Sequence, residues 1–138
     1  MFKTLPLFLA FTGAAVFAEE PVWFTVMGNA SDPSVDSVEL NVARLPPRGE
    51  ISTMDLRVTL AVQRTMPDGE KYTSYHSQIA IDCDQEAVVH VEQVRYEGPQ
   101  WTGAPTAQHF HEMRPMAFGG LAPNPKDRVL KAACRHTP

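Results

Sequence analysis

The chain has 138 residues, of which 43% are hydrophobic and 20% charged, and its formal net charge is −4. This size corresponds to one small globular domain. No run of lysine or arginine could follow a phosphate backbone, so the composition argues against a nucleic-acid partner. Beyond the N-terminal segment, no stretch reaches the roughly 20 apolar residues that a membrane-spanning helix requires.

The N-terminal residues 1–18 have the layout of a secretory signal peptide. Lys3 supplies the positive start, residues 5–16 are mostly apolar, and small residues precede the expected cleavage point after Ala18. A membrane anchor is disfavoured because the apolar run is short. We expect a mature single domain over 19–138 in the periplasm or at the cell surface, with no lipobox cysteine for lipid anchoring.

The chain contains two cysteines, Cys83 and Cys134. In an oxidising compartment such a pair favours one disulfide. The alternatives are a metal-binding pair and a nucleophile beside a spectator thiol. A metal pair is disfavoured because neither cysteine has a partner at C-x-x-C spacing.

Alternating apolar and polar residues predict a series of β-strands. The clearest pattern runs from Met54 to Gln63, where the apolar positions repeat with period two. The density of glycine and proline over 97–123 predicts a loop with at most a brief pairing around 110–116. The expected strands are 21–27, 37–42, 54–63, 71–83 and 87–96, the last with a bulge at Glu92-Gln93.

The C-terminal segment carries the signals of a helix. Asn124 is a suitable N-cap, and Pro125 suits the first helical position. Apolar residues at 129, 130, 133 and 134 form one stripe, which places Cys134 on the buried side. Because Cys83 points inward from its strand, a bridge between the two would fix the helix across the sheet. The predicted fold is α+β, an antiparallel sheet of five or six strands packed by one C-terminal helix.

Several segments together carry a family resemblance. They are Trp23-Phe24-Thr25-Val26, the run 75–83 ending in Asp82-Cys83, the strand end Tyr96-Glu97-Gly98, and the terminal helix ending in Cys134. They resemble the surface-adhesin protein E family of Gram-negative bacteria over nearly the whole mature chain. The resemblance implies an antiparallel sheet bridged to a C-terminal helix, in an exported protein that binds host extracellular-matrix or envelope proteins and forms a homodimer.

Tyr96 and Trp101 are the candidate binding residues. Trp101 follows Tyr96 in a loop framed by glycine and proline, and aromatic residues displayed in this way are typical interface anchors. The alternative is that Trp101 folds back and covers the core. Trp23 lies in an apolar strand and is expected in the core.

The histidines provide the candidate metal ligands. His109 and His111 lie two residues apart beside Glu112, and such a pair can chelate zinc or copper if further ligands join it. This segment defines an alternative function, a periplasmic metal- or small-ligand-binding protein. We expect His76 and His90 on one face of the sheet but about 13 Å apart, too far to share an ion.

No hydrolase, metalloprotease, phosphate-loop or dinucleotide motif occurs in the sequence. The sequence therefore favours an exported, non-enzymatic binding protein without a cofactor. Its expected partner is another protein.

Overall fold

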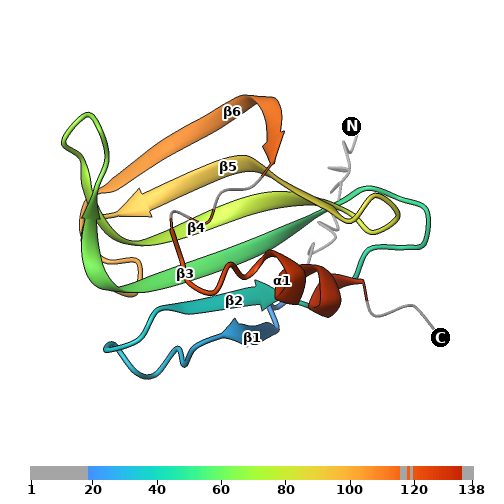
Figure 1. Ribbon diagram of the computed structural model, residues 1–138, viewed down its shortest axis with the longest axis horizontal. Coiled ribbons are helices and arrows are strands. Elements are labelled where there is room, and N and C mark those ends of the chain that lie inside the picture. Colours follow the sequence, from blue (N-terminus) through green and yellow to red (C-terminus); the bar gives the residue numbers. More distant parts are fainter. Residues whose placement is uncertain (1–18, 116–117, 119, 135–138) are drawn as a thin grey trace, which may run out of the picture.

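The computed structural model describes residues 19–115, 118 and 120–134, with the backbone alone over 109–115. The chain forms one six-stranded antiparallel sheet in which each strand pairs with its neighbours in sequence (Figure 1). Each strand is connected directly to the next antiparallel strand, which produces this meander order. The strands are β1 (Trp23–Met27), β2 (Ser37–Asn41), β3 (Ser52–Thr65), β4 (Lys71–Asp82), β5 (Ala87–Tyr96) and β6 (Pro105–Pro115).

The two faces of the sheet have different surroundings. One face is apolar and lies under helix α1 (Lys126–Ala133) and the segment before it, which contributes Phe118 and Leu121 to the core. The period-two alternation in the strands directs these apolar side chains to one side. The opposite face, called here the open face, carries polar and aromatic residues. The core strand residues include Val38, Leu40, Leu56, Val58, Ile79, Ile81 and Val88.

Helix α1 is fixed at both ends. The side chain of Asn124 accepts a hydrogen bond from the backbone N–H of Lys126 at 2.9 Å, which satisfies one of the free donors of the first turn. At the other end, Cys134 is bridged to Cys83, and the two Cα atoms lie 5.7 Å apart. The predicted disulfide and C-terminal helix are thus confirmed. The helix begins one residue later than expected, because Pro125 is the N-cap and Lys126 is the first helical residue.

Strand β6 corrects the expectation of a loop over 97–123. β6 is eleven residues long and pairs with β5 from Pro105 opposite Tyr96 to Pro115 opposite Val89, with a register shift between His90 and Glu92. The two prolines stand at the ends of a strand on the sheet edge, where a missing N–H removes no internal ladder bond. Only 97–104 form the connecting turn.

The bulge in β5 lies earlier than expected. Pairing with β4 shifts between His90 and Glu92, so the extra residue is Val91 rather than part of Glu92-Gln93. As a result His90 lies opposite Ile79 and faces the core, where its Nδ1 lies 2.5 Å from the hydroxyl of Ser77. The expectation that His90 shares a face with His76 was therefore wrong.

Replacing Cys134 by serine tests how much the bridge stabilises the fold. The disulfide joins residues 51 positions apart, and loop-closure entropy gives an upper value of about 4 kcal/mol for its contribution to the free energy of unfolding. We expect Tm to fall by about 10 °C or more in thermal denaturation under oxidising conditions. Dithiothreitol should destabilise the wild type and leave Cys134→Ser unaffected; an unchanged Tm of the variant would contradict the expectation.

Candidate functional site

An ion pair joins two neighbouring strands on the open face. Arg57 on β3 stands opposite Glu39 on β2 in the register. Its guanidinium donates to both carboxylate oxygens of Glu39, at 2.7 and 3.1 Å. The side chains of Arg57 and Glu39 are only 21% and 8% exposed. Two parallel bonds in a partly desolvated position fix the guanidinium plane.

Two tryptophan rings stack on this guanidinium. The Cζ atom of Arg57 lies 4.1 Å from the ring centroid of Trp23 and 4.4 Å from that of Trp101. His76 on β4 packs against this cluster of aromatic rings. The centroid of its ring lies 4.9 Å from the ring centroid of Trp101 and 5.8 Å from that of Tyr96. Cation–π attraction and ring packing both favour this arrangement. The five side chains Trp23, Arg57, His76, Tyr96 and Trp101 are called here the Trp–Arg platform.

The turn between β5 and β6 brings Trp101 onto the platform. The hydroxyl of Ser74 donates to the carbonyl of Gly98 at 2.7 Å and accepts from the N–H of Trp101 at 2.9 Å. Gln100 and Trp101 have φ angles of 49° and 60°. Non-glycine residues adopt this left-handed region at an energetic cost, so the bonds to Ser74 hold a strained turn.

A side chain at position 98 would disrupt the same turn. A Cβ atom on Gly98 would clash with the side chain of Thr102. The close approach also brings the N–H of Gly98 to the carbonyl of Thr102 at 2.9 Å. Glycine at position 98 therefore allows the turn to fold back over the sheet.

The environment of His76 favours the neutral form of its imidazole. Burial and the neighbouring Arg57 guanidinium lower the pKa of its imidazole, and Asp55 opposes them with a smaller effect. Its Nε2 atom and the Nε1 atom of Trp101 are buried without a hydrogen-bond partner among the described residues. The platform thus holds two polar atoms that its own packing does not satisfy.

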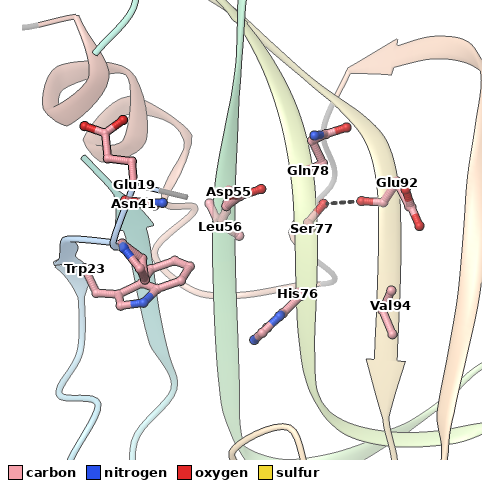
Figure 2. Close-up of a pocket in the computed structure, with 11 residues that line it drawn as sticks. Glu19, Trp23, Asn41, Asp55, Leu56, His76, Ser77, Gln78, Glu92 and Val94 are labelled. Atoms are coloured by element: carbon pink, nitrogen blue, oxygen red, sulfur yellow. Dashed lines mark hydrogen bonds between the residues drawn. The ribbon is translucent and has the colours of Figure 1, made fainter. Parts of the chain in front are cut away.

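A pocket of about 400 Å³ adjoins the platform on the open face (Figure 2). Trp23 and His76 belong to both the platform and the pocket. The side chains of β1 to β5 and the segment before β1 surround it. Its lining consists of Glu19, Pro21, Trp23, Asn41, Asp55, Leu56, His76, Ser77, Gln78, Glu92 and Val94.

The predicted binding residues Tyr96 and Trp101 come together on the platform. Both are partly buried, and Trp101 folds back onto the open face, not onto the core. Trp23, which was expected in the core, stands on the open face instead, since it pairs with Asn41 in the same polar row as Asp55. Sequence reasoning missed Arg57, although the period-two pattern of β3 already assigned it to the polar side.

The candidate metal ligands His109, His111 and Glu112 lie on strand β6, and their side chains are outside the described residues. In the backbone register, His109 stands opposite Glu92. Among the side chains that the structure describes, no group of three or more His, Cys, Asp or Glu is placed to hold a metal ion. Within the same described ranges, no helix is long and apolar enough to cross a membrane.

The fold and the open face define a small α+β domain with one covered and one accessible sheet face. The chain belongs to the surface-adhesin protein E family, whose model matches residues 23–135. That match contains the whole platform and both cysteines. No curated protein and no solved structure shows significant similarity to the chain.

The lowered pKa of His76 predicts a loss of stability in mild acid. Unfolding returns the imidazole to its ordinary pKa of about 6.5, so the unfolded chain binds more protons just below that pH. The contribution of His76 to stability is therefore complete above about pH 6.5 and is lost as the pH falls toward the lower pKa of the folded state. Urea unfolding at pH 7.0 and 5.5 should show the decrease.

His76→Gln is the matched variant for this measurement, because glutamine keeps a polar side chain but does not titrate. We expect the variant to show a smaller difference in stability between the two pH values. Equal pH dependence in both proteins would mean that His76 is not the responsible group.

Proposed function

We propose that the protein is a non-enzymatic, adhesin-like binding protein that contacts a protein partner with the Trp–Arg platform. Membership of the surface-adhesin protein E family supports the class. The composition of the platform supports its assignment as the binding surface, because tryptophan, tyrosine and arginine are the residues that most often dominate binding energy at protein interfaces. The platform also lies on the face that α1 leaves uncovered.

The rigidity of the platform is the observation that carries this proposal. Arg57 is held by two bonds to Glu39 and by rings on two sides, and the backbone next to Trp101 is bonded to Ser74. Side chains that are already ordered lose little conformational entropy when a partner binds. Such pre-ordered aromatic groups are suited to act as anchors.

We propose that residues 1–18 direct export and that the mature chain begins at Glu19. N-terminal sequencing of protein recovered from the cell envelope is expected to start at Glu19, and a start at Met1 would contradict export by this route. Protease treatment of intact cells then separates surface exposure from a periplasmic location, with a periplasmic protein as the control.

The proposed partner is a host extracellular-matrix protein. Membership of a surface-adhesin family supports a host protein as the partner. A homodimer is a further proposal, because β1 and β6 form the two edges of the sheet and an antiparallel edge can pair with a second copy. Light scattering of the purified protein measures this directly.

Replacing Trp101 by alanine tests the binding face. We expect binding to immobilised basement-membrane extract to weaken by about tenfold or more, because a central aromatic anchor is lost. Trp101→Phe, which keeps a ring over Arg57, should retain more of the binding. Ile51→Ala is the control, since Ile51 is 61% exposed and lies outside the platform. Equal binding by wild type and Trp101→Ala, with equal Tm, would overturn the proposal.

A further inference from the structure

We infer that the turn between β5 and β6, residues 97–104, is a pH-sensitive switch of the binding face. When His76 is protonated, the turn releases Trp101 from the platform, and the protein loses affinity for its partner. This inference rests on the proposed function and names the regulation of that same surface. Three features support it: the position of His76 beside a fixed cation, two buried ring nitrogens without partners, and the strain of the turn.

His76 is surrounded by aromatic rings and by a fixed guanidinium. It stands opposite Arg57 in the pairing of β3 with β4, and Figure 2 shows its imidazole on the side of β4 that faces β3. Its ring centroid lies 6.4, 5.8 and 4.9 Å from the ring centroids of Trp23, Tyr96 and Trp101. The backbone of β4 is paired with β3 and with β5 at this position. The buried Nε2 atom therefore reaches water through a movement of side chains, not of the strand.

A proton on His76 disturbs this packing in two ways. It adds a positive charge beside Arg57, whose two bonds already occupy the carboxylate of Glu39. Both ring nitrogens of a protonated histidine are donors, so the buried Nε2 atom would carry a charged N–H without an acceptor among the described residues. Burial and, to a smaller extent, Arg57 accordingly lower the pKa of the imidazole.

The carboxylates around His76 do not reverse this effect. Asp55 raises the pKa of the imidazole, but less than burial and Arg57 lower it. Among the described residues, no carboxylate forms an ion pair with His76. The carboxylates on the surrounding elements are Glu19 before β1, Glu39 on β2, Asp55 on β3, Glu92 on β5 and Glu97 in the turn.

The turn that carries Trp101 is the strained part of the platform. Gln100 and Trp101 have left-handed backbone angles, and the Nε1 atom of Trp101 is buried without a described partner. Opening the turn relieves both costs, whereas separating the strands would break the hydrogen bonds of the sheet. The bonds of Ser74 to Gly98 and Trp101 oppose the opening. A change of charge at His76 therefore acts on a segment that is already poised to move.

Acid shifts the turn from the closed to the open state. When the turn opens, water reaches the imidazole of His76, and its pKa returns toward the ordinary value of about 6.5. The open state therefore binds a proton more tightly than the closed state, and its population grows as the pH falls below about 6.5. The platform then keeps only one of its two tryptophan anchors, so partner binding weakens.

Acrylamide quenching of tryptophan fluorescence tests the release of Trp101. The two tryptophans of the chain are Trp23 and Trp101, so a Trp23→Phe background leaves Trp101 as the reporter. We expect the quenching constant to rise about twofold or more between about pH 7.5 and pH 5.0, with an unchanged far-UV circular dichroism spectrum. In the same background, His76→Gln should abolish the rise. His109→Gln, which removes a histidine from β6, is the matched control and should retain it.

Ser74→Ala tests the switch without a change in pH. The variant removes the hydroxyl that holds the turn closed. In the Trp23→Phe background, we expect acrylamide to quench Trp101 at pH 7.5 nearly as strongly as it quenches the parent protein at pH 5.0. Quenching equal to that of the parent at pH 7.5 would contradict the role of the turn.

Binding to immobilised basement-membrane extract at the same two pH values tests the effect on the partner. We expect the affinity of the wild type to fall by about threefold or more in acid, relative to the change seen with His76→Gln. The comparison with His76→Gln corrects for titration of the extract itself.

A quenching constant that does not change with pH, a rise that persists in His76→Gln, or a rise that accompanies loss of the circular dichroism signal would each overturn the inference. Equal pH dependence of binding in the wild type and His76→Gln would do the same. These outcomes are separable from failure of the proposed function. If Trp101→Ala binds the extract more weakly than the wild type while quenching is independent of pH, the binding face stands and the switch falls. If acid releases Trp101 but Trp101→Ala binds the extract normally, the turn opens as inferred and the proposed function fails.

Discussion

The ion pair between Arg57 and Glu39 is the interaction on which the open face depends. It joins β2 to β3 with two bonds and holds the guanidinium where two tryptophan rings, from β1 and from the turn after β5, can stack on it. Removing either charged partner would leave the other in a partly desolvated place without compensation, which costs more than the pair contributes. Lysine at position 57 would keep the charge but lose the planar fork and the stacking surface.

The platform is ordered at an energetic cost. Two residues of the turn adopt left-handed backbone angles, and two ring nitrogens, on His76 and Trp101, are buried without partners among the described residues. An unsatisfied buried donor or acceptor costs about 1–3 kcal/mol. Stacking on Arg57 and the hydrogen bonds to Ser74 offset the energetic costs of the strained backbone and of the unsatisfied nitrogens. Strain of this kind is characteristic of surfaces whose geometry serves binding rather than stability.

The disulfide and α1 determine which face of the sheet remains available. A single sheet has two faces, and a stable domain must cover at least one of them. The bridge from Cys83 to Cys134 ties α1 to the apolar face, where Val129 and Ala133 are fully buried. The opposite face then needs no cover from the rest of the chain. Family membership in the surface-adhesin protein E group is consistent with a domain that presents such a face to a partner.

The sequence by itself determined the strands, the cysteine pair and the terminal helix, because period-two alternation, an even number of cysteines and an N-cap are local signals. For β6 it predicted a loop with at most a brief pairing around 110–116, because proline at the ends of an edge strand looks the same in sequence as proline in a loop. Only the tertiary structure decided which side chains meet on the open face. The bulge at Val91 set the side on which His90 lies, and the strained turn brought Trp101 across the sheet to Arg57. Such contacts depend on strand register and on a turn conformation held by distant residues, which no local pattern encodes.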